Sequence, residues 1–207
     1  MYTPPAFRLD DRRDMFTTMR AARLANVITA TADGPFATPL PLFLDESEGE
    51  YGVLYGHLAK ANPQWRTPVI GDGLAIFMGP DAYVTPAWYA TKQQTGKVVP
   101  TWNYVTVQAR GPVEFFDDAG RLLDVVTRLT ALHEAPRAVA WAVDDAPADF
   151  IASQLRGIIG LRMPITHLEG KRKMSQNRNE ADRQGVANGL SESARASDRD
   201  VATQIPV

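Results

Sequence analysis

The sequence predicts a mainly β fold, in the form of a small antiparallel barrel with peripheral helices. Six or so segments of strand character come largely before the helical ones, and the strand–helix–strand alternation of a doubly wound sheet does not occur. The chain has 207 residues, of which 44% are hydrophobic. That is enough to bury one core, or one core with a small appendage.

The first predicted element is a helix over residues 10–24, which follows a proline-rich entry. Asp10 or Asp11 can cap it, since a short acidic side chain accepts hydrogen bonds from the first free backbone N–H groups. Behind this cap the apolar side chains recur at helical spacing. The same helical pattern extends to Arg23.

Residues 26–44 predict two strands that turn at Asp33-Gly34, a strong hairpin signal. Pro39 and Pro41 remove backbone donors at alternate positions of the second strand. We therefore expect this strand at a sheet edge, or interrupted where another segment approaches.

Further strands are predicted over residues 51–58 and 73–79, and residues 82–89 predict a short strand that runs into an aromatic loop. A longer β segment over residues 98–116 is expected to break near Gly111-Pro112, because a proline cannot donate to the ladder. Residues 157–170 predict a last strand.

Two helices are predicted between these last strands. Residues 118–134 have helical spacing, and residues 147–156 begin with a proline in the first turn. From Lys171 the chain is polar, and residues 195–207 are expected either to dock as a helix or to fray. We expect one domain over residues 1–190 and a polar tail over residues 191–207. The apolar residues expected on one side of the first of these helices are Leu122, Leu123, Val126, Leu129 and Leu132.

Composition excludes several functional classes. The formal net charge is −2, which does not suggest broad nucleic-acid binding. The chain has no cysteine, so disulfides, thiolate metal sites and a cysteine nucleophile are excluded. No secretory signal and no apolar run of membrane-spanning length is present, and we expect a cytoplasmic protein. The three histidines share no ligand spacing, and no phosphate-binding loop, dinucleotide fingerprint or serine-hydrolase elbow occurs.

Three stretches carry candidate chemistry, and each has a structural alternative. His57, Lys60 and Asn62 follow a strand and suit an anion site, or else Asn62 caps a short helix and the others are ordinary strand-end residues. Residues 170–178 hold four positive charges and no negative one, which suits a phosphate or polar chain, or a solvated basic loop. The aromatic residues of segments 82–89 and 100–104 suit a planar heteroaromatic ligand or a subunit interface, or else belong to the core.

These segments, in this order, resemble the PaiB-like family, which is described as FMN-binding negative transcriptional regulators with a flavin-reductase-like split barrel. The matching stretches are "MYTPPAF", "GHLAKANPQW", "IFMGPDAYVTPAWY", "VPTWNYVTVQARG", "IIGLRMPI" and "GKRKMSQNR". They extend from Met1 to about Leu190. The resemblance implies a flavoprotein and a homodimer, with FMN at the subunit interface and two sites per dimer.

The resemblance also implies a set of cofactor-binding residues. One group is expected at the phosphate or ribityl end, a second beside the isoalloxazine ring, a third along the wall of the site, and a fourth on the basic segment. In that order they are His57, Lys60 and Asn62; Thr38 and Leu40; Thr101, Trp102 and Asn103; and Lys171, Ser175, Gln176 and Asn177.

Three functions remain open from the sequence. The first is an FMN-binding transcriptional regulator, although the helices between Asp118 and Arg156 are too far apart for a helix-turn-helix, and direct DNA binding is not supported. The second is a flavin-dependent reductase or oxidase, in which His57 is the only plausible base. The third is a split barrel that binds haem, with His57 or His167 as the axial ligand.

Overall fold

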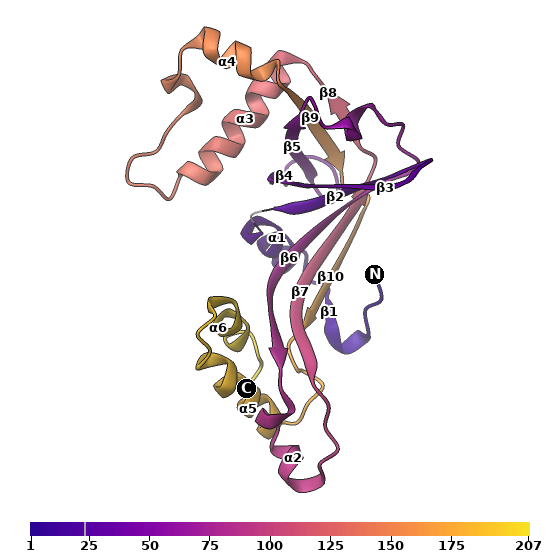
Figure 1. The fold of residues 1–207 in the computed structure, drawn as a ribbon, viewed down its shortest axis with the longest axis vertical. Helices are drawn as coiled ribbons and strands as arrows, with labels where there is room; N and C mark the ends of the chain where they lie inside the picture. Colours follow the sequence, from indigo (N-terminus) through magenta and orange to yellow (C-terminus); the bar gives the residue numbers. More distant parts are fainter. Residues whose placement is uncertain (23) are drawn as a thin grey trace. The chain divides into compact units, whose positions relative to one another are not determined.

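The computed structural model describes residues 1–22 and 24–207. The fold is mainly β with peripheral helices, as predicted (Figure 1). One sheet has the strand order β1-β10-β7-β6-β2-β3, and a second has the order β4-β5-β9-β8. The strands are β1 (Arg8–Leu9), β2 (Ala25–Thr31), β3 (Gly34–Leu40), β4 (Leu42–Asp45), β5 (Val53–Ala59), β6 (Gly73–Val84), β7 (Thr101–Gly111), β8 (Glu114–Phe116), β9 (Ile158–Pro164) and β10 (His167–Lys173).

The helices lie at the periphery. The α-helices are α1 (Arg12–Ala21), α2 (Ala90–Thr95), α3 (Ala119–Glu134), α4 (Ala148–Leu155), α5 (Glu180–Ser191) and α6 (Ala196–Ala202). Short 3-10 turns are η1 (Pro5–Phe7), η2 (Pro63–Arg66), η3 (Pro86–Trp88) and η4 (Val143–Asp145). No helix of the described residues is long and apolar enough to cross a membrane.

The chain divides into two compact units. Unit 1 comprises residues 1–21, 78–107 and 169–207, and unit 2 comprises residues 22–77 and 108–168. In unit 1, β1 pairs antiparallel with β10. In unit 2, β2 pairs antiparallel with β3 and with the first part of β6, and β5 pairs antiparallel with β4 and β9.

The amino-terminal predictions are confirmed. The Asp11 carboxylate accepts hydrogen bonds from the backbone N–H groups of Arg13 (2.7 Å) and Asp14 (3.4 Å), and α1 begins there. Arg23, which the sequence pattern assigns to this helix, lies outside the described residues. The hairpin turns at Asp33-Gly34, and β3 is the last strand of its sheet. At Pro41 the chain leaves that strand and continues as β4 in the second sheet.

Two predictions placed the boundaries between strands wrongly. The segments 73–79 and 82–84 form the single strand β6, which continues through Gly79-Pro80. A Cβ atom at position 79 would lie 3.0 Å from the Cβ of Val105, so glycine here permits a close approach of β7. Residues 158–173 form two strands instead of one. They separate because the N–H groups of Ile165 and Thr166 donate outside the ladder, to the carbonyl oxygens of Gly52 and Arg110.

Helix α3 covers the core of unit 2, and the prediction of its apolar face is correct in part, because Leu122 and Leu129 are buried and Val126 packs against the core. Leu122, Val125 and Leu129 are its buried residues, whereas Leu123 and Leu132 are 41% and 45% exposed. Spacing alone allowed both faces, and packing selected the one that meets the sheet. The core that this face completes consists of Phe43, Phe116, Leu122, Val125, Leu129 and Leu155.

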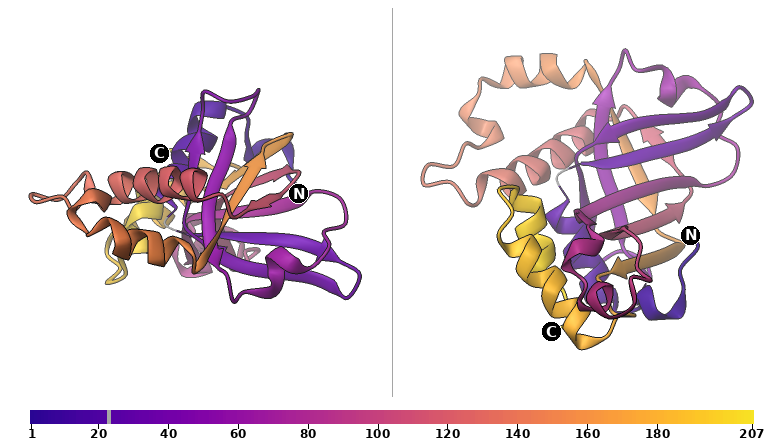
Figure 2. Two further views of the ribbon diagram at one scale, coloured as in Figure 1. Left: turned by 90° about the horizontal axis from the view of Figure 1, so that it is seen from above. Right: turned by 60° about the horizontal axis from the view of Figure 1, so that its bottom comes forward.

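The carboxyl-terminal region of unit 1 is helical, and α5 is a helix that the sequence pattern did not predict. The side-chain oxygen of Asn179 caps this helix by accepting a hydrogen bond from Asp182 N–H at 2.8 Å. Helix α6 then packs against α5 (Figure 2), with Val201 fully buried. Of the two expectations for residues 195–207, docking as a helix is therefore the correct one.

Candidate functional site

The predicted cofactor-binding residues are distributed over both units, and each group is described by itself. Thr38, Leu40, His57, Lys60 and Asn62 belong to unit 2. The others belong to unit 1, namely Thr101, Trp102, Asn103, Lys171, Ser175, Gln176 and Asn177.

In unit 1, side chains from β7, from the end of β10 and from the segment after it line a small cavity of about 40 Å³. We call these residues the Ser175 cluster. Four of them, Thr101, Asn103, Ser175 and Asn177, are predicted site residues. The full set is Tyr89, Thr101, Asn103, Lys173, Ser175, Asn177 and Arg178.

Ser175 has an unusual backbone conformation at the centre of this cluster. Its φ angle is +61°, and no other non-glycine residue in the described ranges has a positive φ. Its carbonyl oxygen accepts a hydrogen bond from Arg178 N–H (2.9 Å), which closes a turn. Its hydroxyl group is buried with the amide of Asn103 at 3.0 Å. A left-handed residue after a strand reverses the chain here and brings Arg178 back to the cluster.

Lys173 supplies a cation that is already held in place. Its ammonium group donates to the Thr101 hydroxyl group and to the carbonyl oxygen of Trp102, the second at 2.6 Å. Desolvation by burial lowers the pKa of Lys173, and the positive charges of Lys171 and Arg178 lower it further. Three cations in one neighbourhood repel one another, and a bound anion would relieve that repulsion.

Tyr89 and Arg178 also belong to the cluster, although the predicted set omits them. The Arg178 guanidinium lies 4.7 Å from the centre of the Tyr89 ring. The Tyr89 hydroxyl group is buried and makes no hydrogen bond of ordinary geometry within the described residues. Burial raises the Tyr89 pKa, and the charge of Arg178 opposes that rise. Both residues stand in stretches that the sequence singled out, but nothing in the sequence indicated that they meet.

Other predicted residues of unit 1 are engaged in local structure. Gln176 accepts a hydrogen bond from Met174 N–H at 2.6 Å and donates one to the carbonyl oxygen of Arg172. Lys171 is buried and donates to the carbonyl oxygen of Tyr2 (3.2 Å). The Trp102 ring is 46% exposed, and its indole N–H donates to Asp81 at 2.8 Å. Of these three, Trp102 presents an accessible aromatic face.

In unit 2, Asn62 caps η2, which is the structural alternative that the sequence allowed. Its side-chain oxygen accepts from Gln64 N–H (2.9 Å), and its side-chain nitrogen donates to the Thr38 hydroxyl group (3.0 Å). The main chain of Lys60 is also engaged, because its N–H donates to Gly157 and its carbonyl oxygen accepts from Trp65 Nε1. These bonds give η2 a defined position after β5.

His57 and Gln64 carry polar atoms that this framework does not satisfy. The Nδ1 atom of His57 and the Oε1 atom of Gln64 are buried and find no hydrogen-bond partner among residues 1–22 and 24–207. Desolvation lowers the pKa of His57, which keeps the imidazole neutral near pH 7. Leu40 is a core residue, 5% exposed. Buried polar atoms without partners mark places where a ligand or water can bind.

No group of three or more His, Asp or Glu side chains in the described ranges could hold a metal ion. The positive charges of the Ser175 cluster and the two unsatisfied atoms of unit 2 are the chemical features that need an explanation.

Comparison with known proteins gives three kinds of likeness. The sequence profile of a family described as "Putative FMN-binding domain" matches residues 1–167. The Bacillus subtilis protein named protease synthase and sporulation protein PAI 2 is 32% identical over 193 residues, which are 92% of this chain and 89% of that protein.

Solved structures are similar in fold. The flavocytochrome Anf3 from Azotobacter vinelandii superposes with a TM-score of 0.55 at 16% identity, covering 79% of this chain and 67% of that one. The FAD and haem-binding protein from Mycobacterium smegmatis gives a TM-score of 0.51 at 16% identity, covering 79% and 71%. These likenesses confirm the predicted fold class, a mainly β split barrel with peripheral helices.

Proposed function

The chain belongs to the family described as "Putative FMN-binding domain", as a PaiB-like member, and on that premise we propose that it is a flavoprotein that binds FMN. The single observation that carries the proposal is the Ser175 cluster, where cations and directional donors surround a small cavity. FMN ends in a phosphate monoester, which carries a charge of roughly −1.5 to −2 near pH 7. A chain of net charge −2 must gather its positive groups locally to hold such an anion.

The residues of this cluster fit a phosphate in charge and in donor type. Lys173 and Arg178 supply two positive charges, and the Ser175 hydroxyl and Asn177 amide supply short, directional hydrogen bonds. The buried Tyr89 hydroxyl group, which has no partner of ordinary geometry in the described part of the chain, adds a further donor. We therefore assign the phosphate to the Ser175 cluster.

The remaining candidates stay predictions for other parts of the cofactor. Trp102 is an exposed aromatic residue that suits stacking, and Thr101 and Asn103 lie beside it in sequence on β7. Thr38, Leu40, His57, Lys60 and Asn62 of unit 2, with Lys171 and Gln176 of unit 1, complete the predicted set. We further propose that two chains form a homodimer with the cofactor sites at their interface.

Bound FMN would supply one- and two-electron redox chemistry. This chain would hold the phosphate through fixed cations. It would also keep the His57 imidazole neutral near pH 7, because burial lowers the pKa of His57. We propose that the FMN-bound protein is a negative regulator of transcription in the cytoplasm. This role follows from the resemblance to the PaiB-like family, to which the Bacillus subtilis relative named protease synthase and sporulation protein PAI 2 is similar as well. It would act through a partner or a small molecule, because the net charge of −2 does not favour direct DNA binding.

A second candidate function is a flavin-dependent oxidoreductase. The specific observation that favours it is His57, a neutral and half-buried imidazole with an unsatisfied Nδ1 atom, which suits a proton acceptor. Bleaching of bound flavin by NADH or NADPH would support this function, and failure with several reductants would reject it. A haem-binding split barrel is a third candidate. The absence of a Soret band after haem addition would reject it.

The test of FMN binding is a visible absorption spectrum of the purified full-length protein, before and after FMN is added, together with its mass by light scattering. Flavin bands that co-migrate with a dimer are the expected result. A protein that remains colourless with excess FMN would overturn the cofactor proposal. A monomer that binds FMN would overturn only the dimer. Sequence-selective DNA binding at moderate salt would overturn the indirect mode of regulation.

A further inference from the structure

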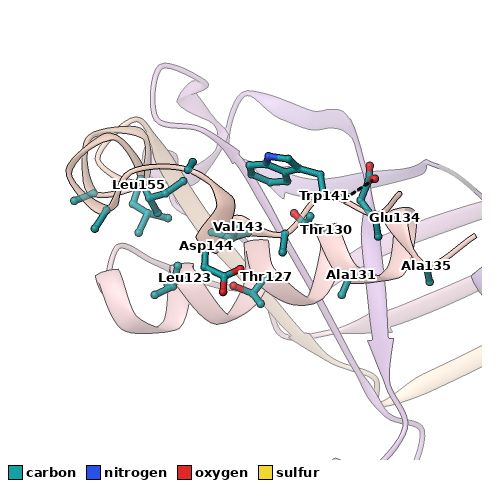
Figure 3. A pocket seen from close by; sticks show the side chains of 16 residues that line it. Leu123, Thr127, Thr130, Ala131, Glu134, Ala135, Trp141, Val143, Asp144 and Leu155 are labelled. Atoms are coloured by element: carbon teal, nitrogen blue, oxygen red, sulfur yellow. Dashed lines mark hydrogen bonds between the residues drawn. The ribbon is translucent and has the colours of Figure 1, made fainter. Parts of the chain in front are cut away.

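A cavity between α3 and α4 lies entirely in unit 2, and none of the predicted cofactor residues lines it. Its volume is about 800 Å³, which is in the usual range of small-molecule sites. It is open to solvent on one side, and helix α3, the segment 140–147 and helix α4 line it (Figure 3). Apart from Glu134 and Asp144, it is lined by apolar and uncharged residues, of which the most prominent are Leu123, Trp141, Ile151 and Leu155.

Two faces of α3 make contacts, and one of them lines the cavity. One face packs on the sheet through Leu122, Val125 and Leu129. The residues Leu123, Thr127 and Ala131, at intervals of four, form the floor of the cavity on another face. At a rise of about 1.5 Å per residue, the helix from Leu123 to Glu134 is about 16 Å long, so the cavity accommodates an extended ligand.

The chain that crosses over α3 is fixed by hydrogen bonds. The N–H group of Trp141 donates to Glu134 at 3.2 Å, the dashed bond in Figure 3. The Asp145 carboxylate accepts from Ala142 N–H at 2.8 Å. Glu134 also pairs with Arg137 at 3.0 Å, so its charge is partly compensated. The segment that carries Trp141 over the helix therefore has a defined path.

The charge of this cavity is of one sign. Its lining includes two carboxylate residues and no basic residue. Residues 138–155 contain three aspartates and no lysine, arginine or histidine. Asp144 makes no ion pair or hydrogen bond within the described ranges, and Figure 3 shows its side chain beside Thr127 at the cavity. Trp141 adds an aromatic face, the surface that organic cations prefer.

We propose that this cavity binds an apolar organic cation, an arylalkyl or alkyl amine, in a site separate from the flavin. The apolar body lies along the α3 floor and against Trp141, and the ammonium group lies near Asp144. A neutral ligand of the same shape lacks the charge attraction. A carboxylate of the same shape is repelled by Asp144.

The test uses three probes of one shape and three charges: 4-phenylbutylamine, 4-phenylbutanol and 4-phenylbutyrate. Their affinities for the full-length protein are measured by titration calorimetry. The amine is expected to bind most tightly and the carboxylate most weakly. Asp144→Asn should reduce amine affinity about two- to fivefold, the usual range for an accessible ion pair, and leave the alcohol unchanged. Asp149→Asn, the same change at an exposed residue outside the lining, is the matched control and should leave all three affinities unchanged.

A second variant tests the apolar part of the site. Trp141→Ala should weaken the amine and the alcohol roughly tenfold, because it removes much of one apolar wall. FMN binding should be the same in all three variants, which separates this site from the cofactor. The proposal is overturned if the three probes bind equally, if none binds, or if Asp149→Asn has the same effect as Asp144→Asn.

Discussion

Asn103 and Ser175 exchange hydrogen bonds between buried side chains, although 72 residues separate them. The Asn103 amide nitrogen donates to the Ser175 hydroxyl oxygen at 3.0 Å, and that hydroxyl group lies 3.3 Å from the Asn103 amide oxygen. This pair joins β7 to the turn that follows β10. Because Lys173 and Arg178 flank that turn, the pair also sets the position of the two cations that we assign to phosphate.

Ser175→Ala tests how much this hydrogen-bonded pair contributes to stability. The change leaves the buried Asn103 amide without its partner and should lower the free energy of unfolding by about 1–3 kcal/mol. Urea denaturation measures the difference. Ser175→Gly loses the same hydroxyl group but relieves the positive φ, so it should be about 1 kcal/mol less destabilising than alanine. Ser153→Ala, at an exposed helical position, is the control and should change stability by less than about 0.5 kcal/mol. Equal stability of Ser175→Ala and Ser153→Ala would contradict this account.

Lys173→Ala tests where the phosphate binds. A charge-assisted hydrogen bond contributes roughly 1.5–3 kcal/mol, so FMN affinity should fall about ten- to hundredfold. Riboflavin, which has no phosphate, should lose little affinity. Titration of flavin fluorescence gives both constants. Lys60→Ala is the comparison, since the sequence predicted Lys60 at the phosphate or ribityl end. A selective loss of FMN in Lys60→Ala, with none in Lys173→Ala, would transfer the phosphate to unit 2.

His57→Gln tests the effect of the buried imidazole on stability against pH. Desolvation lowers the pKa of His57 in the folded state below 6.5, so the unfolded chain binds a proton first as the pH falls. The neutral imidazole therefore contributes its full share to the free energy of unfolding above about pH 6.5. Below that pH the contribution falls, by at most about 1.4 kcal/mol for each pH unit. Urea unfolding at about pH 7.5 and pH 5.5 should show a smaller difference in the variant. His133→Gln, at an exposed helix end, should keep the wild-type difference.

Two glycine-to-alanine changes in helices should have opposite effects. At Gly185, in α5, the new Cβ atom would collide with the carbonyl oxygen of Trp88, a backbone atom that cannot move easily. Gly185→Ala should therefore destabilise the protein by about 1–3 kcal/mol. At Gly120, in the first turn of α3, the nearest atom would be 3.4 Å away. Gly120→Ala should stabilise the protein by about 0.5–1 kcal/mol, because alanine loses less backbone entropy. Thermal unfolding of both variants measures the contrast, and a Gly185→Ala variant that is as stable as Gly120→Ala would show that α5 does not pack closely on η3.

The sequence was most informative where structure depends on neighbouring residues. The hairpin at Asp33-Gly34, the break at Gly111-Pro112 and the helix over residues 118–134 are all confirmed. It was less informative where packing overrides a local signal. The sequence pattern predicted that one strand ends at Gly79 and another begins at Ala82, yet β6 continues through both. The two glycines of α5, Gly185 and Gly189, weaken its helical pattern, and only the contacts with Trp88 explain them.

By itself, the sequence determined a mainly β fold with peripheral helices and the resemblance to an FMN-binding family. Periodicity, turn residues and short motifs are local properties, and a local reading retrieves them. Only the tertiary structure decided that Tyr89 and Arg178 join Asn103 and Ser175 around one cavity, and that Asn62 is occupied as a helix cap. The cavity residues lie far apart in the chain, and the two possible roles of Asn62 use the same side chain. Only the folded backbone decides which residues meet and which role that side chain takes.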